Sequence, residues 1–386
     1  MSRFLNSKTG KAKPVFSLLS PAPAASYQGS GQLAGTYGEA ATVTRGSAKL
    51  CETSVSTVAS VSSNKAAVEP RGVRIEAAHT NLILQSQAFD DAAWTTQGVV
   101  VAAPVVTPNA AIAPDGTMTA DRVDFAAALN SGETSGIYQS IVTSAGAYTF
   151  SVWIKGVSGS GHIYWLEFDG SFASPQPIPF TTEWSRVSIT KTLFASLSAA
   201  TELGYSAAWT GGTGGPASVY MWGAQFETGP ISHSYVPTTS GTVTCAKDAV
   251  SLASSALPLA AGSIETLFTP EWSTNAGATL LDSRDGSTND SGVALYVVGA
   301  DMTFQVGIDS GSNVTSTGLT WAANQTYRIR AQWGGGAMKL YVNEALAAFK
   351  NSGAISPGSH DVLRLGNGFG GSSPLDGYLS DLRFYA

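Results

Sequence analysis

The chain has 386 residues, and only 12% of them are charged, whereas about 25% is usual for a soluble domain. Its formal net charge of −6 at pH 7 supplies no overall basic field, which argues against nucleic acid as a partner. No apolar run comes near the ~20 residues of a membrane-spanning helix, so we expect no membrane insertion. Glycine, serine, threonine and alanine replace the missing charges, a composition that favours short strands joined by tight turns.

Residues 1–27 have no hydrophobic core of their own and predict an extended N-terminal arm. Their apolar stretch at 15–19 is shorter than the roughly 7–15 residues of a secretory signal core, so we expect no cleaved signal. Ordering such an arm costs about 1–2 kcal/mol per residue in backbone entropy, so we expect a partner to hold it. The residues that we expect to anchor it are basic or apolar: Arg3, Phe4, Leu5, Lys8, Lys11, Lys13 and Phe16.

Beyond the arm, apolar and polar residues alternate with the period of two that predicts β-strands. Four segments show this alternation clearly: 149–155, 162–168, 219–226 and 327–333. Within 162–168, Trp165 and Glu167 share one face of the expected strand, and Tyr164 and Leu166 share the other. No segment keeps the 3.6-residue period of a helix for three turns.

Short strands separated by turn residues predict an all-β protein. We expect two consecutive β-sandwich (jelly-roll) domains with an extended N-terminal arm. The predicted boundaries are 1–27 for the arm, 28–250 for the first sandwich with its leading edge strands, and 251–386 for the second. Thr-Val-Thr occurs at 42–44 and again at 242–244, which predicts two similar edge strands that bracket the first sandwich.

Motifs for covalent or metal chemistry are missing from the sequence. The four histidines are scattered, and no Gly-x-Ser-x-Gly elbow or Cys-His signature accompanies them. Glu265 and Glu271 lie six residues apart in a stretch broken by proline, which does not match the paired carboxylates of a glycosidase. We therefore expect that the chain is not an enzyme.

Cys51 and Cys245 are too few for a disulfide framework or a zinc site. They could pair across the first domain, but two thiols is the favoured interpretation.

Two separated segments carry a resemblance to a known family. Residues 73–86 read VRIEAAHTNLILQS, and residues 221–239 contain MWGAQFETG followed by SYVPTT. These paired motifs resemble those of bacteriophage virion proteins, over about residues 36–250. The resemblance implies a jelly roll like that of carbohydrate-binding modules, carried on tail fibres, head fibres and spikes. His79 and Cys245 stand where the family commonly has arginine, which weakens any transfer of detailed roles.

Residues 262–386 resemble the laminin-G and concanavalin-like sandwiches. The carriers are GSIETLF at 262–268, TYRIR at 326–330, KLYVN at 339–343 and GYLSDLRFY at 377–385. Many members have Asn-Gly or Asp-Gly after the Leu-Tyr-Val strand, where this chain has Asn343-Glu344. The fold hosts lectins, adhesion modules and spacers alike, so the resemblance implies a fold rather than an activity.

Two kinds of binding site have candidate residues. Calcium prefers oxygen ligands, and Asp282, Asp285 and Asp290 crowd one loop, although a solvated acidic turn is the favoured alternative. We expect no other cofactor. Aromatic rings dock against the C–H faces of sugars while carboxylates bond their hydroxyls. The glycan candidates are Trp165, Glu167 and Trp209, with packing against a neighbouring subunit as the favoured alternative for each of them.

Together these features predict a phage virion structural protein on the exterior of the particle. We expect a tail or head fibre or spike subunit that attaches the particle to host surface polysaccharide. Its arm would join other virion proteins, and the subunit would form a homo-oligomer, with a trimer favoured. One alternative is a capsid or tail decoration protein with no ligand. Another is an accessory carbohydrate-binding module of a secreted polysaccharide-degrading system.

Overall fold

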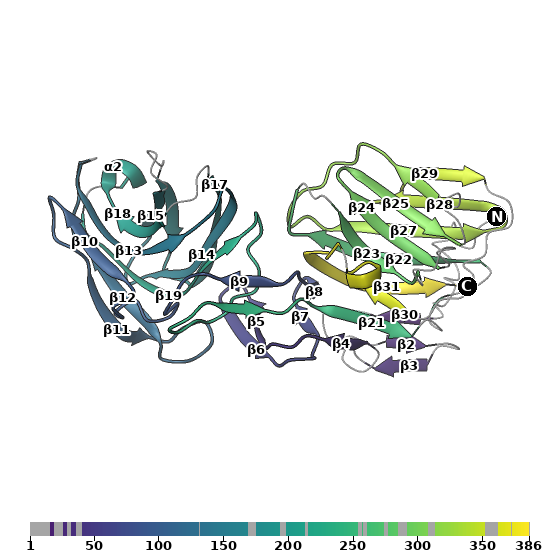
Figure 1. The fold of residues 1–386 in the computed structure, drawn as a ribbon, viewed down its shortest axis with the longest axis horizontal. Coiled ribbons are helices and arrows are strands. Elements are labelled where there is room, and N and C mark those ends of the chain that lie inside the picture. The colour runs from purple at the N-terminus through teal and green to yellow at the C-terminus, as the bar shows by residue number, and fades with distance from the viewer. Residues whose placement is uncertain are drawn as a thin grey trace. The chain divides into compact units, whose positions relative to one another are not determined.

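The computed structural model describes a defined part of the chain, in which strands dominate (Figure 1). The described residues are 16–18, 26–28, 32–35, 41–130, 132–168, 175–193, 198–212, 215–253, 257, 261–273, 277–284, 292–307, 313–351, 362–371 and 373–385. The helical elements among them are α2 (Ala207–Thr210) and the 3-10 turn η3 (Phe369–Gly371). The predicted all-β class is therefore confirmed. No helix in this part of the chain is long and apolar enough to cross a membrane.

The chain folds into two compact units that interleave along the sequence. The insert unit consists of Lys49–Ser60 and His79–Cys245. The C-terminal unit consists of Met1–Ala48, Val61–Ala78 and Ala246–Ala386. The chain therefore passes between the units four times. The linear boundaries that we predict at 27/28 and 250/251 stay a prediction.

The insert unit is a sandwich of two antiparallel five-stranded sheets. Sheet I contains, in spatial order, β10 (Thr95–Val99), β13 (Thr134–Val142), β18 (Ser198–Tyr205), β15 (Gly161–Phe168) and β16 (Gln176–Phe180). Sheet II contains β11 (Val105–Ala111), β12 (Ala120–Phe125), β19 (Ala217–Thr228), β14 (Gly146–Gly156) and β17 (Ser185–Leu193). Figure 1 shows α2 beside β15 and β18 of sheet I.

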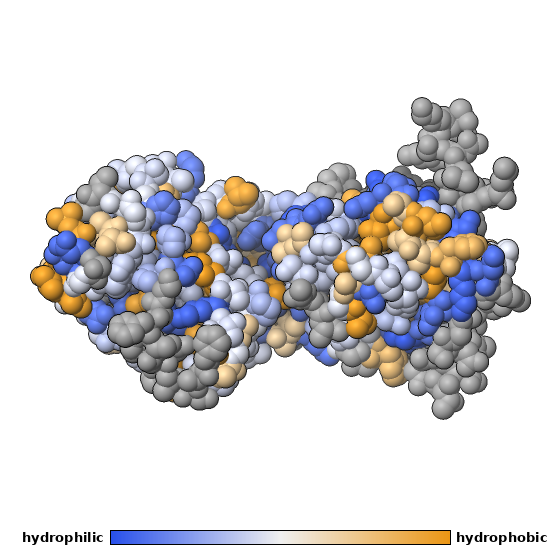
Figure 2. Space-filling view, turned by 90° about the horizontal axis from the view of Figure 1, so that it is seen from above, coloured by the Kyte–Doolittle hydropathy of each residue, from blue (hydrophilic) through white to orange (hydrophobic). Residues whose placement is uncertain are grey.

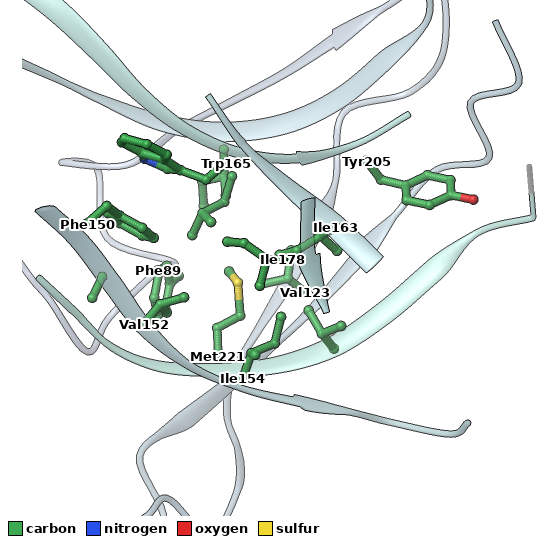
Figure 3. Close-up of a cluster of buried hydrophobic side chains, with 14 of the residues drawn as sticks. Phe89, Val123, Phe150, Val152, Ile154, Ile163, Trp165, Ile178, Tyr205 and Met221 are labelled. Carbon is green, nitrogen blue, oxygen red and sulfur yellow. The ribbon is translucent and has the colours of Figure 1, made fainter. Parts of the chain in front are cut away.

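The core of the insert unit lies between these two sheets. Alternate residues of β14 point inward, namely Phe150, Val152 and Ile154, as the period-two pattern predicts. Ile163 and Trp165 of β15 meet them from sheet I (Figure 3). The inward face of β15 is therefore the face that carries Trp165.

The other face of sheet II carries a second, smaller core. Trp153 and Trp222 occupy paired positions on β14 and β19, and Tyr235 packs beside Trp222. Val58 covers them from the hairpin of β5 (Lys49–Ser54) and β6 (Thr57–Val61). This hairpin gives sheet II a buried outer face, whereas sheet I has no hairpin of this kind among the described residues.

One asparagine ties the beginning of the jelly roll to its end. Asn81 ends β9 (His79–Asn81), which pairs with β20 (Val243–Cys245). Its amide nitrogen donates to the carbonyl oxygens of Ala224 and Val236, and its side-chain oxygen accepts from the amides of Ile83 and Phe226. Because Asn81 is fully buried, these four bonds satisfy an amide that would otherwise be costly to bury.

The C-terminal unit contains two larger antiparallel sheets. One has the order β29 (Ala345–Asn351), β28 (Ala337–Val342), β27 (Tyr327–Gly334), β22 (Gly262–Pro270), β31 (Gly377–Tyr385), β1 (Phe16–Leu18), β2 (Ser26–Gln28) and β3 (Gln32–Gly35). In this sheet β8 (Gly72–Ile75) also pairs with β31, and β7 (Ala67–Glu69) pairs with β8. The other has the order β26 (Asn313–Ser316), β25 (Asp301–Val306), β24 (Val293–Val298), β23 (Ala278–Asp282), β30 (Val362–Leu365), β21 (Ala249–Ala253) and β4 (Thr42–Thr44).

Strand β29 is the edge of the larger sheet and exposes Leu346 and Phe349. Figure 2 shows hydrophobic residues gathered on this face of the C-terminal unit. The ammonium of Lys339 lies 5.9 Å from the ring centre of Phe349. Lys350 lies on β29 itself, and a lysine on an edge strand disfavours uncontrolled pairing with another chain.

The two Thr-Val-Thr segments belong to different units, so the prediction that they bracket one sandwich is wrong. Strand β4 pairs with β21 in the C-terminal unit, and β20 pairs with β9 in the insert unit. The residue after each segment explains the difference. Arg45 is buried and forms a 2.7 Å ion pair with Asp248, which holds β4 beside β21. Cys245 instead lies opposite His79.

The N-terminal arm is described in part. Phe16 lies in β1, where it pairs with Phe384 of β31, so residues 16–18 extend a sheet of their own chain. A partner chain is therefore not needed to supply main-chain hydrogen bonds to this short segment. The other predicted anchor residues lie outside the described residues: Arg3, Phe4, Leu5, Lys8, Lys11 and Lys13. Cys51 and Cys245 are both buried and are not joined in a disulfide, as the favoured interpretation expects.

Candidate functional site

Two of the three predicted glycan contacts face the core. Trp165 is 1% exposed, stacks on Phe150 with 5.5 Å between ring centres, and donates from its indole nitrogen to the Thr201 hydroxyl at 2.8 Å. Glu167 lies on the same inward face and is also buried. Neither side chain is accessible to a sugar, which corrects the sequence-based assignment. Trp165 and Glu167 do share a face, but it is the face that packs against sheet II.

Trp209, the third candidate, lies on the outward side of sheet I. It is half-buried on the single turn α2, which Gly211 ends in the left-handed conformation at φ 69°. The amide of Ala207 donates to the carbonyl oxygen of Ala128, which fixes α2 to the loop between β12 and β13. The Trp209 ring meets the Tyr164 ring at an angle of 69°, with 5.0 Å between centres. Tyr164 is itself fully buried, so Trp209 supplies the accessible ring of the candidate site and Tyr164 packs behind it.

A carboxylate lies beside the two rings. Glu202 of β18 accepts a 2.6 Å hydrogen bond from the Tyr164 hydroxyl and a 3.2 Å hydrogen bond from the Gln97 amide. It is 7% exposed, whereas Gln97 and Tyr138 of the neighbouring strands are half-buried. Glu202 therefore forms the floor of the site, and the more exposed side chains form its rim.

Two glycines let this floor lie flat on the sheet. Gly136 pairs with Gly204, and Gly204 pairs with Tyr164, so the three residues lie side by side on β13, β18 and β15. A methyl group at position 204 would collide with the Tyr164 hydroxyl, and one at position 136 would collide with a Glu202 carboxylate oxygen. Glycine inside a strand commonly marks such a close approach.

Burial shifts the pKa values of Tyr164 and Glu202 upward. Burial raises the pKa of Glu202, while the hydrogen bonds from Tyr164 and Gln97 lower it in part. Burial and the adjacent Glu202 carboxylate also raise the pKa of Tyr164, so the phenol remains protonated. A carboxylate has about four lone-pair positions, and the two hydrogen bonds leave acceptor capacity for a ligand.

Of the three aspartates predicted to bind calcium, Asp282 is among the described residues. Asp282 is buried, and its carboxylate oxygens accept hydrogen bonds from the Arg284 guanidinium at 3.0 and 2.7 Å. The arginine occupies the side of Asp282 that a cation would need. Asp285 and Asp290 lie outside the described residues, and calcium binding stays a prediction. Within the described ranges, no group of three His, Cys, Asp or Glu side chains is placed to hold a metal ion.

A buried histidine pair lies in the insert unit and was not predicted from the sequence. His79 and His233 stack with 4.6 Å between ring centres, and His233 lies 2.6 Å from the carboxylate of Glu227. Burial alone raises the pKa of Glu227, but the hydrogen bond and charge of His233, the charge of His79 and the Gln225 amide together lower it. The two histidines are 154 positions apart, so their spacing in sequence carried no signal, although both lie in the paired motifs.

Glu271 belongs to a buried charge network in the C-terminal unit. Arg74 donates to both of its carboxylate oxygens, and Arg74 also lies 2.9 Å from Glu76. The Tyr378 hydroxyl donates to Glu69 at 2.9 Å. Tyr378 and these charged side chains are buried. Glu271 therefore takes part in a buried ion-pair network.

Known proteins resemble the chain in parts. Residues 241–386 match a family model described as Concanavalin A-like lectin/glucanases superfamily. No curated protein matches the chain. The resemblance that we predict for residues 262–386 is thus confirmed at the level of a concanavalin-like domain.

Three solved structures show a partial likeness to the chain. One is domain 4 of AbnA, an extracellular arabinanase of Geobacillus stearothermophilus, in complex with arabinotriose: 16% identity, 41% of this chain, 77% of that chain and a TM-score of 0.30. Another is the binding domain of Botulinum Neurotoxin DC: 13% identity, 36% of each chain and a TM-score of 0.28. A third is the tandem CBM22-1–CBM22-2 domain of Paenibacillus barcinonensis Xyn10C: 10% identity, 81% of this chain, 98% of that chain and a TM-score of 0.29.

Proposed function

We propose that the insert unit binds a glycan on the outward side of sheet I. The observation that supports this function is the meeting of Trp209, Tyr164, Glu202 and Gln97 on one face. The ring of Trp209 supplies an apolar surface for the C–H face of a sugar. Glu202 and Gln97 supply hydrogen-bonding groups for the hydroxyls of that sugar. A mostly apolar wall with a few convergent polar groups is the usual composition of a ligand site.

Two substitutions test this proposal. Trp209→Ala and Glu202→Gln should each lower glycan affinity about tenfold or more, which corresponds to about 1.4 kcal/mol. Trp184→Ala is the matched control, because Trp184 is another half-buried tryptophan but precedes β17 of sheet II. Affinity is measured on a glycan array and then by titration of the best ligand. Unchanged affinity in Trp209→Ala, or a loss in Trp184→Ala alone, would contradict this site.

We further propose that this binding attaches a phage virion to host surface polysaccharide, with the chain as a fibre or spike subunit that does not cleave its ligand. The paired motifs at 73–86 and 221–239 support this context. Antibody labelling of particles in the electron microscope tests it. Labelled particles without glycan binding would favour a decoration protein. Glycan binding without labelled particles would favour an accessory module of a secreted system.

The proposed anchor can be separated from the sheet to which residues 16–18 belong. Deleting residues 1–15 removes Arg3, Lys8, Lys11 and Lys13 but keeps β1 beside β31. We expect a folded, soluble protein that still binds glycan and no longer joins particles or its own oligomer. Incorporation at normal copy number would exclude the arm as the anchor.

A further inference from the structure

We propose that the site on sheet I is specific for neutral glycans and rejects chains of uronic or sialic acids. This inference rests on the proposed glycan function and names the class of ligand. It follows from the charges that the outward face of sheet I presents, and from how firmly its carboxylate is held.

Among its described residues, the outward face of sheet I has one carboxylate, one histidine and no arginine or lysine. Strand alternation and the cross-strand pairs identify the outward-facing residues as Thr95, Gln97, Val99, Thr134, Gly136, Tyr138, Ser140, Val142, His162, Tyr164, Leu166, Pro177, Pro179, Glu202 and Gly204. Sites for anionic ligands commonly use arginine or lysine to pair with the ligand charge. Glu202 would instead repel a carboxylate placed against Trp209.

Glu202 cannot turn away from such a ligand without losing its contacts. Tyr164 on the adjacent strand β15 and Gln97 on β10, which lies beyond β13, hold its two oxygens. The carboxylate also lies directly over Gly136, where no side chain separates it from the sheet. A fixed, partly desolvated carboxylate interacts more strongly with a second charge than a mobile one in water does. The same carboxylate accepts hydrogen bonds from neutral hydroxyls without that penalty.

Affinity electrophoresis of the full chain tests the inference, with neutral and acidic polysaccharides in parallel gels near neutral pH and at low salt. Galactomannan, mixed-linkage glucan, xylan and dextran serve as neutral probes, and polygalacturonate, alginate and hyaluronan as acidic probes. We expect retardation by at least one neutral probe and by none of the acidic ones. Glu202→Gln should weaken the neutral interaction about tenfold and should produce measurable retention by at least one acidic probe.

Glu133→Gln is the matched control, because Glu133 is half-buried in the loop before β13, where its carboxylate accepts hydrogen bonds from Leu129 and Asn130. It should change neither pattern. If an acidic probe retains the unmodified protein and Trp209→Ala abolishes that retention, the site binds acidic glycans. The assignment to neutral glycans would then be wrong, while the proposed glycan binding would stand. No retention by any probe on either the gels or the array would overturn both.

Discussion

Arg74 and Glu271, 197 positions apart, are joined by three hydrogen bonds of 2.8 to 3.1 Å. Arg74 lies on β8, and Glu271 directly follows β22, so the contact fastens the early strand to the C-terminal sheet. Both side chains are buried. Removing one partner of a buried ion pair leaves an uncompensated charge in the interior.

Arg74→Met should lower the free energy of unfolding by about 3–5 kcal/mol. Arg328→Met is the control, because its contact with Glu344 is exposed on both sides and should contribute about 0–1 kcal/mol. Urea unfolding followed by tryptophan fluorescence measures both. Equal losses of unfolding free energy in the two variants would show that the buried network stabilises the fold no more than the exposed pair does.

The segment that matches the family model should not fold well alone. Residues 241–386 lack β8, so β31 loses a neighbouring strand and Glu271 loses Arg74. They also lack Arg45, the buried partner of Asp248. We expect this fragment to unfold without a cooperative transition, whereas joining residues 41–78 to 246–386 by a short linker should restore one. Calorimetry compares the thermal unfolding of the fragment and of the linked chain. A sharp transition in the fragment alone would show that it folds without β8 and Arg45.

The paired glycines can be tested separately from the residues that they support. Gly136→Ala places a methyl group against the Glu202 carboxylate, which is the movable end of a flexible side chain. We expect weaker glycan binding, by several-fold, with little loss of stability. Gly132→Ala, where an added methyl group meets open space, should leave binding unchanged. Titration calorimetry with the best ligand compares them, and equal affinities would contradict the proposed floor.

Trp165→Ala should act on stability and not on the binding site. Removing a buried tryptophan that stacks on Phe150 should cost about 3–5 kcal/mol of unfolding free energy. Trp209→Ala should cost less, because Trp209 is half-buried. Denaturant unfolding measures the cost, and affinity is then expressed per folded molecule. A lower affinity per folded molecule in Trp165→Ala would show that the Trp165 ring contacts the glycan.

Glu227 should give the insert unit an acid-sensitive stability. Its pKa in the folded state lies below the value of about 4.3 expected in an unfolded chain, because His233, His79 and Gln225 together outweigh burial. The stabilisation by its charge is therefore complete above about pH 5 and is lost as pH falls through the folded pKa. The difference in unfolding free energy between wild type and Glu227→Gln should shrink on acidification. A constant difference would mean that this carboxylate does not titrate as proposed.

The sequence located the strand of the candidate site but not its accessible face. Alternation in 162–168 predicted a strand, and β15 spans Gly161–Phe168. Both faces carry aromatic residues, so composition could not tell inside from outside. That choice depends on contacts far away in the sequence, with Phe150 on one side and Trp209 on the other. Trp209 was identified because it precedes a glycine-rich stretch rather than lying on a strand.

The paired motifs predicted the fold well because their residues build it. Asn81 bonds to both ends of the jelly roll, and the Ser86 hydroxyl lies 2.6 Å from that of Tyr235. Such buried hydrogen bonds specify the fold but carry no information about the ligand. The turn at Asn343-Glu344 shows similar tolerance, since both residues adopt positive φ and close the hairpin between β28 and β29 without the usual glycine.

The pairing of β9 with β20 places the two ends of the longest inserted segment side by side. Cys245 lies opposite His79, so residues 79–245 begin and end at neighbouring positions, about 5 Å apart between paired α-carbons. A segment with adjacent ends can be exchanged as a cassette, because its host chain needs only a short bridge between residues 78 and 246. Recombination could therefore replace the face that we propose for sugar binding while keeping the C-terminal sheets, and engineered chimaeras could use the same two junctions.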